Sequence, residues 1–335
     1  MPVPERGSMA EGDTPCIELV NEDDRILWIK DETRNPTGTH KDRAMSVGVA
    51  AAVEAGASTV VAASTGNAGA SAAAYAARAG LRCVVLTMAT IPRVVAAQIT
   101  ALGATLAAYP DRTTRNRMMT EAVRELGWYP LTNYELPCSG DNPYANEGYK
   151  SIAYELARDL GSDVDAVVVP TSGADVLAGI ERGYRELLAA GLVDRVPRMV
   201  AAETATGAPF TAALSHADRA AQERVTVEDT GSPAFSIGST NPTWQGLNAL
   251  WRTNGEAIAV DVDDYMTERT TLPATTGFHL ESSSAVSVVA ARRVLGNARR
   301  VVALATGSGL KDLTGDELRQ VQISPPNLDA LTTTR

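Results

Sequence analysis

The sequence predicts an α/β fold of two three-layer domains, each built on a mainly parallel sheet. Short apolar runs alternate with longer segments of helical pattern, and several of the runs end in a polar turn that leads into a helix. Strand, helix, strand in this order is typical of an open parallel sheet with helices on both faces. A chain of 335 residues is long enough for about two such domains.

The individual elements follow from the same pattern. Short apolar runs predict strands, and longer segments with helical period or composition predict helices. The polar stretch 216–233 contains acids and turn formers and predicts a surface loop. The predicted strands are 26–29, 59–63, 83–87, 166–169, 199–202 and 301–305, and the predicted helices are 42–54, 68–78, 93–102, 112–126, 151–160 and 176–189.

Composition excludes several classes of function. Forty acidic against thirty basic residues give a net charge of -10, which argues against binding to nucleic acid or to an anionic membrane. The longest uncharged stretch, 55–77, is too weakly apolar to span a bilayer, and no charged-then-apolar leader opens the chain, so we expect a cytoplasmic protein. The three cysteines, Cys16, Cys83 and Cys138, and the three histidines lie far apart in the chain, and none shows the spacing of metal ligands. We therefore expect neither a metal site nor a disulfide framework.

Lysine is rare in this chain, since only four of its thirty basic residues are lysines: Lys30, Lys41, Lys150 and Lys311. Where arginine is the general surface cation, each lysine becomes a candidate for amine chemistry. Lys41 follows a Pro-Gly turn and opens a predicted helix that Thr39 can cap. The positive end of the helix dipole would hold its amine closer to the neutral, nucleophilic form. On position alone, the alternative is an ordinary surface lysine in a first helical turn.

Four polar turns lie at predicted helix starts or strand ends, and their side chains and N–H groups suit a small ligand. Each turn alone is also compatible with a plain N-cap, but ligands on parallel sheets bind beyond the carboxyl ends of the strands, so together the turns predict one shared site. The Asp175 carboxylate would repel a bound phosphate unless it turns away. A nucleotide-binding oxidoreductase is disfavoured because no G-x-G-x-x-G follows the first strand. The turns are 35–41, Ser64-Thr65-Gly66-Asn67-Ala68, Thr171-Ser172-Gly173-Ala174-Asp175 and 306–312.

These turns, in this order, resemble those of the pyridoxal-phosphate enzymes of fold type II, the tryptophan synthase β-like family, and threonine synthases among them. The resemblance covers about residues 12 to 312. Its motifs are Gly12-Asp13-Thr14-Pro15, Lys30-Asp31-Glu32, Asn35-Pro36-Thr37-Gly38 with Lys41-Asp42-Arg43, Ala63-Ser64-Thr65-Gly66-Asn67, Asn142-Pro143-Tyr144 with Glu147-Gly148-x-Lys150, Glu281, and Thr306-Gly307-x-Gly309-Leu310-Lys311-Asp312.

The resemblance implies a role for each turn. Lys41 would form a Schiff base with pyridoxal 5'-phosphate and, once displaced by substrate, would move protons at the substrate Cα. Asn67 would bind the 3-hydroxyl of the cofactor, and Thr306 would face its pyridine nitrogen, where a neutral hydroxyl favours elimination and replacement over transamination. The cofactor phosphate would be held by Thr171, Ser172, Gly173, Ala174, Asp175 and His40. The substrate carboxylate would be held by Ser64, Thr65, Gly66, Asn67 and Ala68.

Several departures from the threonine synthase pattern put the substrate in question. Ala145 stands where these enzymes usually have an arginine that helps to bind the phosphate of phosphohomoserine, and its loss removes a bidentate clamp. His40 replaces an aromatic residue, as in tryptophan synthase β. Glycines of the phosphate turn become Ser172, Ala174 and Asp175, while Ala68, Ser282 and Ser283 replace other residues of the family pattern.

The resulting expectation is a pyridoxal-phosphate lyase or synthase that acts on a β- or γ-substituted L-amino acid. The first hypothesis is a threonine synthase-like reaction, in which O-phosphohomoserine undergoes elimination and water is added. The alternatives are β-elimination or β-replacement on a serine-, threonine- or phosphoserine-like substrate, and a degenerate cofactor- or amino-acid-binding protein without turnover. For Lys150 and Lys311 a structural role is expected, with Glu147 a candidate partner of Lys150.

The resemblance also implies a domain arrangement. Residues 1–43 and 137–335 would form a large pyridoxal-phosphate-binding domain, and residues 44–136 a small mobile domain that carries the asparagine turn. The site would lie between them and close around the substrate. Because enzymes of this family are commonly homodimers, the resemblance also implies a homodimer.

Overall fold

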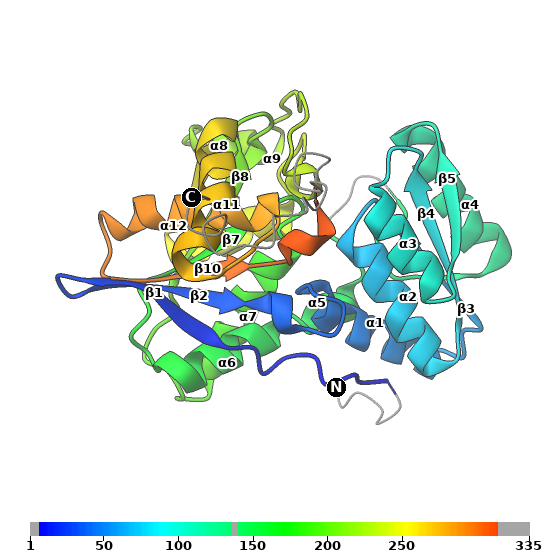
Figure 1. Cartoon of the computed structure of the whole chain (residues 1–335), viewed down its shortest axis with the longest axis horizontal. Coiled ribbons are helices and arrows are strands. Elements are labelled where there is room, and N and C mark those ends of the chain that lie inside the picture. Colours follow the sequence, from blue (N-terminus) through cyan, green and yellow to red (C-terminus); the bar gives the residue numbers. More distant parts are fainter. Residues whose placement is uncertain (1–6, 136–139, 314–335) are drawn as a thin grey trace, which may run out of the picture.

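A computed structural model of the chain describes residues 7–135 and 140–313. Its described residues form two sheets that lie in separate halves of the molecule (Figure 1). Every strand pair in them is parallel except the pair of β1 with β2. The larger sheet has the order β1 (Cys16–Glu22), β2 (Arg25–Asp31), β10 (Arg300–Ala305), β7 (Ala166–Pro170), β8 (Arg198–Thr204) and β9 (Glu256–Val260), and the smaller has the order β5 (Thr105–Tyr109), β4 (Arg82–Met88), β3 (Thr59–Ala63) and β6 (Tyr129–Pro130).

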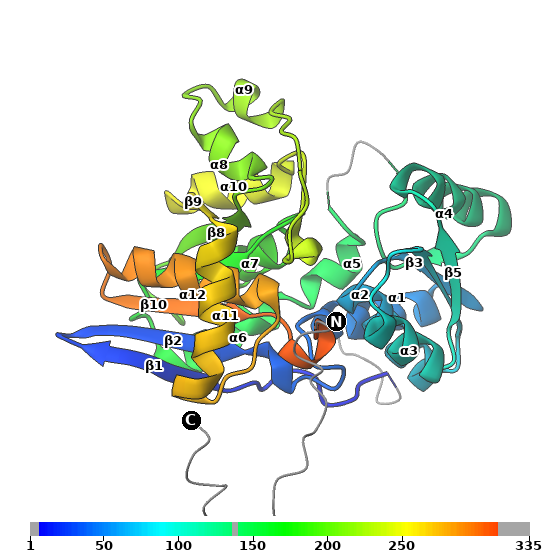
Figure 2. The ribbon, with the colours of Figure 1, turned by 45° about the horizontal axis from the view of Figure 1, so that its top comes forward.

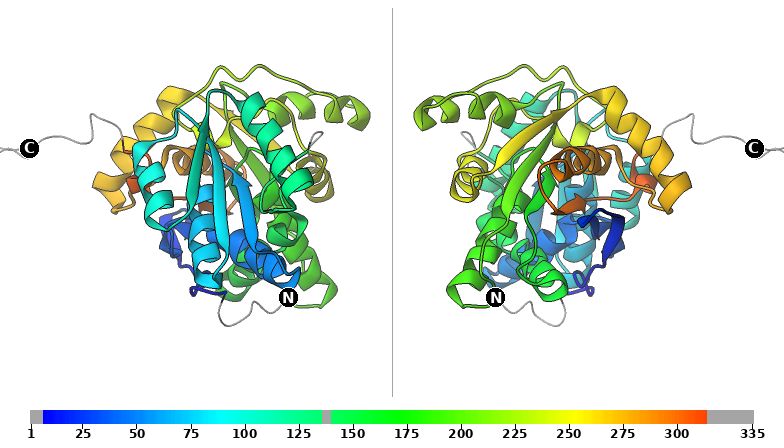
Figure 3. Two further views of the ribbon diagram at one scale, coloured as in Figure 1. Left: turned by 90° about the vertical axis from the view of Figure 1, so that its right-hand side faces the viewer. Right: turned by 90° about the vertical axis from the view of Figure 1, so that its left-hand side faces the viewer.

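Helices cover both faces of each sheet, as the predicted three-layer architecture requires (Figures 2 and 3). On the larger sheet, one face carries α11 (Val262–Thr276) and α12 (Ser282–Leu295), and the other carries α6 (Lys150–Leu160), α7 (Asp175–Ala189), α8 (Pro209–Leu214) and α10 (Trp244–Thr253). On the smaller sheet, α1 (Lys41–Glu54), α2 (Asn67–Ala79) and α3 (Arg93–Ala101) lie opposite α4 (Arg112–Leu126). The short elements are α5 (Pro143–Glu147), α9 (Arg219–Glu223), η1 (Glu32–Arg34), η2 (Phe235–Ile237) and η3 (Gly309–Lys311).

The central strands of the larger sheet, β2, β10, β7 and β8, contain apolar runs because both of their faces are buried. Successive side chains of a strand point to opposite faces. Leu27 and Ile29 therefore pack into the core beneath α12, whereas Trp28 between them packs into the core beneath α7. The neighbouring pair Val167 and Val168 divides between the two cores in the same way.

All six predicted strands and all six predicted helices are confirmed, and every predicted end lies within two residues of the observed one. The sequence pattern missed β1, β5, β6 and β9, which are edge strands of the two sheets with largely half-buried side chains and therefore a weak apolar signal. The stretch 216–233 is mainly loop, as predicted, but it contains the short helix α9. Cys138 lies outside the described residues, and Cys16 and Cys83 are free thiols.

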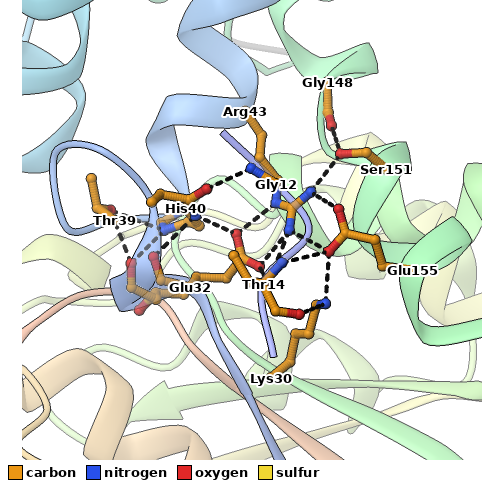
Figure 4. A network of polar contacts seen from close by, with 12 residues as sticks. Gly12, Thr14, Lys30, Glu32, Thr39, His40, Arg43, Gly148, Ser151 and Glu155 are labelled. Carbon is orange, nitrogen blue, oxygen red and sulfur yellow. Dashed lines mark hydrogen bonds and ion pairs between the residues drawn. The ribbon is translucent and has the colours of Figure 1, made fainter. Parts of the chain in front are cut away.

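A buried ionic network fixes the helix that Lys41 opens (Figure 4). The Arg43 guanidinium donates from Nε to Glu32 at 2.6 Å and from Nη1 to Glu155 at 2.6 Å. Lys30 is fully buried, and its Nζ donates to Glu155 at 2.7 Å and to the carbonyl of Thr14 at 2.5 Å. Two cations thus face two carboxylates, so the network has no net charge. It ties α1 to β2, η1 and α6, and gives Lys30 a structural role.

This network makes part of the stability dependent on acid pH. Burial raises the pKa of Glu155, but Arg43 and Lys30 outweigh burial and lower it from 4.5 to about 2. Because the folded-state pKa lies below the ordinary value, Glu155 stabilises the fold fully above about pH 4.5, and this contribution is lost as the pH falls towards 2. In urea unfolding at about pH 5 and about pH 3.5, we expect Glu155→Gln to lose less unfolding free energy on acidification than the wild type. Equal losses in both proteins would contradict this account.

Candidate active site

The predicted site residues gather where the carboxyl end of β10 meets the start of α1. The backbone N–H of His40 donates to the carbonyl of Thr306 at 2.9 Å, and Thr39 forms an isolated antiparallel bridge with Gly307. The Thr39 hydroxyl donates to the same Thr306 carbonyl at 2.9 Å and lies 3.4 Å from the N–H of Lys41. The first turn of α1, which carries Lys41, is therefore held beside the end of β10, although Thr39 and Thr306 are 267 residues apart in the chain.

A single carboxylate joins Asn67 of the smaller sheet to Thr306 of the larger one. The Asn67 amide donates to Glu281 Oε2 at 2.8 Å, and the Thr306 hydroxyl donates to Glu281 Oε1 at 3.1 Å. Gly307 permits this approach, because a Cβ there would lie 2.5 Å from the Glu281 carboxylate. Burial raises the pKa of Glu281 to about 7, against the lowering effect of its two hydrogen bonds. The asparagine turn and the threonine turn thus belong to one site.

The amine of Lys41 points to a tyrosine and two carboxylates. Its Nζ donates to the Tyr149 hydroxyl at 3.1 Å. Burial lowers the pKa of Lys41, but Tyr149, Asp141 and Asp175 outweigh burial, so the pKa lies above its ordinary value. The expectation that the helix dipole keeps this amine near its neutral form is therefore wrong for this structure. The groups that raise this pKa, Tyr149, Asp141 and Asp175, all come from segments outside α1.

The turn after β7 leaves backbone donors free at the start of α7. The Thr171 hydroxyl donates back to the carbonyl of Val169 at 2.7 Å, and the Ser172 hydroxyl to that of Gly238 at 3.2 Å. Ala174 has a left-handed backbone with φ of 60°, which turns the chain into the helix. Within the described residues, the backbone N–H groups of 172–174 have no acceptor. Free N–H groups at a helix start are suited to a phosphate.

Asp175 lies at this helix start with its charge partly compensated. Its Oδ1 accepts hydrogen bonds from the N–H of Asp141 at 2.8 Å, from the Asn146 amide at 2.7 Å and from the Gln245 amide at 2.6 Å. Burial and the nearby Asp175 raise the pKa of Asp141 to about 6, against the lowering effect of Lys41. The three donors thus fix the Asp175 carboxylate against the turn, where its Oδ2 would lie 2.9 Å from a Cβ at Gly173.

The turn after β3 has the same character. The Ser64 hydroxyl accepts from the N–H of Gly66 at 3.1 Å, which closes the turn on itself. The N–H groups of Thr65, Asn67 and Ala68 find no acceptor in the part of the chain that the structure describes. Gly69 lets α2 approach β4, since a Cβ there would lie 2.9 Å from Val85. Three free donors at the start of α2 can bind a carboxylate.

His40 is a neutral side chain in this arrangement. Its Nδ1 lies 3.0 Å from the carbonyl of Thr306, and its ring stacks on Tyr149 with the centroids 5.7 Å apart. Burial, with a smaller contribution from Lys41, lowers the pKa of His40 to about 3. No hydrogen bond joins its ring to the turn 171–175 among the described residues. As placed, His40 supports the start of α1.

Lys150 and Ala145 lie apart from these groups, whereas Lys311 lines the pocket that also holds Asn67 and Glu281. Lys150 pairs with Glu147, as predicted, and also with Glu186 at 2.5 Å. Lys311 is buried, and its Nζ donates to the carbonyl of Thr37 at 2.8 Å and to Gln98 at 2.9 Å, which fixes the turn before Lys41. Ala145 is 1% exposed and packs on α1, where a Cβ at Gly48 would lie only 3.0 Å from it. Ala145 therefore offers no group to a ligand.

Sequence reasoning missed three side chains of the site. Tyr149 is the unspecified position of the motif Glu147-Gly148-x-Lys150, and only its contact with Lys41 distinguishes it. Asp141 directly precedes the motif Asn142-Pro143-Tyr144, and this position beside a motif could have marked it as a candidate site residue. Glu281 was noticed as part of a motif but without a role, although it joins Asn67 to Thr306.

Comparison with known proteins decides the family. The sequence matches the family described as "Pyridoxal-phosphate dependent enzyme" over residues 7–307. The chain belongs to this family. A curated threonine synthase of Methanocaldococcus jannaschii is 31% identical over 319 residues, which cover 91% of this chain and 76% of the relative. The threonine synthase of Synechocystis sp. is 32% identical over 321 residues, which cover 91% and 78%.

The family membership confirms the predicted cofactor, pyridoxal 5'-phosphate, and the predicted enzyme class, a threonine synthase-like lyase. A crystal structure of an O-ureido-L-serine synthase superposes with a TM-score of 0.76 and covers 97% of both chains at 21% identity, which confirms fold type II. No helix in the described residues is long and apolar enough to cross a membrane.

Proposed function

We propose that this pyridoxal-phosphate enzyme performs the threonine synthase reaction: elimination of the γ-substituent of O-phosphohomoserine followed by addition of water. The observation that carries the proposal is the meeting of Lys41, Asn67 and Thr306 at one place, although they come from different parts of the chain. The identity of about 30% to threonine synthases along more than nine-tenths of the chain supports it.

The residues fit the cofactor. The amine of Lys41 would bind its aldehyde, the free N–H groups of residues 172–174 would hold its phosphate, and Asn67 and Thr306 would contact its ring. Two observations count against side-chain contacts of Thr171 and His40 with this phosphate: the Thr171 hydroxyl donates to the carbonyl of Val169, and the His40 ring is neutral. The bound cofactor supplies stabilisation of negative charge at the substrate Cα.

The protein's own groups then place the substrate and move its protons. The free N–H groups of the turn 64–68 would bind the substrate carboxylate, and Lys41 would take and return the proton at Cα. Because the turn 64–68 and Thr306 belong to different sheets, we propose that residues 44–136 move as a unit when substrate binds, and that closure excludes water. A homodimer is part of the same proposal.

A second reaction, β-elimination or β-replacement on a serine-, threonine- or phosphoserine-like substrate, is favoured by one observation. No cation stands at position 145, and the charged side chains nearest Lys41 include the carboxylates Asp141 and Asp175. Such surroundings favour the unphosphorylated members of this class, serine and threonine, over O-phosphohomoserine and O-phosphoserine alike.

Product analysis separates these reactions. The purified enzyme is given O-phosphohomoserine, O-phosphoserine, serine and threonine in separate assays of threonine, phosphate, ammonia and 2-oxo acid. We expect threonine and phosphate in equal amounts from O-phosphohomoserine. Ammonia and 2-oxo acid from the other substrates, without threonine from the first, would establish the second reaction. A protein that binds the cofactor but turns over none of the four would support the non-enzyme alternative.

A further inference from the structure

We propose that Tyr149 is a catalytic partner of Lys41, which holds the lysine amine in place and shares its proton as that amine gains and loses charge. The proposal deepens the proposed function and rests on it for the part that Lys41 plays. None of the sequence motifs described above specifies a residue at this position, so the assignment comes from the geometry around Nζ.

The contact is direct and has no competitor in the described residues. The Tyr149 hydroxyl accepts from Lys41 Nζ at 3.1 Å, and this is the one hydrogen bond that Nζ makes within the described chain. The same amine lies 5.6 Å from the centroid of the Tyr149 ring. Together the two distances place the amine beyond the hydroxyl end of the ring and not over its face, so the hydroxyl is the group of Tyr149 that stabilises the charged amine.

Tyr149 is held rigidly where this contact requires it. It lies between the end of α5 and the start of α6 and is 1% exposed. One side of its ring stacks on His40. Its Cβ packs against α7 at Gly179, where a second Cβ would lie only 2.5 Å away. Any larger residue at 179 would push Tyr149 off its place beside Lys41.

A hydroxyl is suited to both charge states of the amine. Burial, Asp175 and Asp141 raise the pKa of Tyr149 to about 12 against the lowering effect of Lys41, so the phenol keeps its proton at neutral pH. It accepts from the ammonium form of Lys41 and donates to the neutral form. A proton that leaves the substrate Cα goes to Nζ and returns from there, and Tyr149 ends each cycle with its own proton.

The other titratable groups that face Lys41 differ in this respect. Asp141 and Asp175 favour the ammonium form alone, and His40 is neutral and stacked on the tyrosine. Since a carboxylate has no proton to donate, Tyr149 is the neighbour that can stabilise Lys41 after its proton has left.

The test compares Tyr149→Phe with Tyr184→Phe. Phenylalanine keeps the ring that packs on His40 and α7 and removes the hydroxyl. Tyr184 is an equally buried tyrosine of α7 whose hydroxyl has no partner among the described residues, so its substitution is a matched control. The first readout is the rate at which acetic anhydride labels Lys41 in the full-length chain stripped of pyridoxal phosphate, measured by mass spectrometry with Lys150 as internal reference.

We expect Tyr149→Phe to raise the labelling rate of Lys41 by about tenfold at pH 9, because losing a hydrogen bond to the ammonium form lowers its pKa by about one unit. In the reloaded enzyme, kcat falls by about tenfold or more while KM stays within about twofold. Tyr184→Phe changes neither quantity. Unchanged labelling of Lys41 in folded Tyr149→Phe would overturn the proposal.

A second variant and a readout that needs no substrate keep the test decisive. Tyr149→Met also lacks the hydroxyl and gives the same labelling test if the phenylalanine variant does not fold. The labelling rate needs no substrate. If the wild type converts none of the amino acids tested, the proposed function fails, while the labelling still decides the contact between Tyr149 and Lys41.

Discussion

Lys41→Ala is expected to lose the visible absorption band of the lysine-bound cofactor and to lower turnover by roughly 10²- to 10⁴-fold or more. The reason is that, in the proposed function, Lys41 supplies both the amine that binds the cofactor aldehyde and the base that moves the proton at Cα. The measurements are the absorption spectrum of the purified protein, its response to borohydride, and kcat on the substrate that the wild type accepts best.

Lys150→Ala is the control for this experiment. Lys150 is also a lysine at the start of a helix, but its Nζ pairs with Glu147 and Glu186 at the surface. We expect its alanine variant to keep the absorption band and to turn over within a few-fold of the wild type. An intact, borohydride-sensitive band in Lys41→Ala would remove the basis of the proposed function.

Arg43→Met has the largest expected effect on stability. Arg43 is 2% exposed, and its removal leaves the carboxylates of Glu32 and Glu155 in the interior with Lys30 as their one remaining cation. Loss of one partner of a buried ionic network costs about 3–5 kcal/mol. Urea unfolding followed by circular dichroism measures the change in the free energy of unfolding.

Arg117→Met tests whether burial is the cause. Arg117 forms an exposed ion pair with Glu121 on α4 at 2.9 Å, and such a pair contributes about 0.5 kcal/mol or less. The same replacement of arginine by methionine should therefore be nearly silent there. If the two variants lost similar amounts of stability, the buried network would not be what holds α1.

The parts of the site that could be predicted from the sequence are those set by local pattern. Lys41, Asn67 and Thr306 each stand at a polar turn beside a strand end or helix start, and parallel strands bring such turns to one edge. The central strands of the larger sheet, β2, β10, β7 and β8, were predictable for a related reason, since burial on both faces makes them mainly apolar. Helix starts and central strands carry their signal within a few residues.

The remainder depends on contacts between distant segments. Tyr149 reaches Lys41 because α5 and α6 dock on α7 at Gly179, and no local pattern encodes that docking. The pKa of Lys41 was misjudged for the same reason: the helix end is visible in the sequence, whereas the carboxylates of Asp141 and Asp175 arrive from elsewhere. The edge strands β1 and β9 were not predicted because their side chains are mostly half-buried, which weakens the apolar pattern.

The charge balance beneath α1 also limits how this enzyme can change over time. The buried network balances its charges, and replacing any one member leaves an opposite charge unpaired in the interior, which lowers the free energy of unfolding. Its members are Lys30, Glu32, Arg43 and Glu155. Single substitutions are therefore costly in the network that positions Lys41, and less costly at an uncharged, half-buried position near it such as Ala68. Substitutions there can change which substrate binds without changing the position of Lys41.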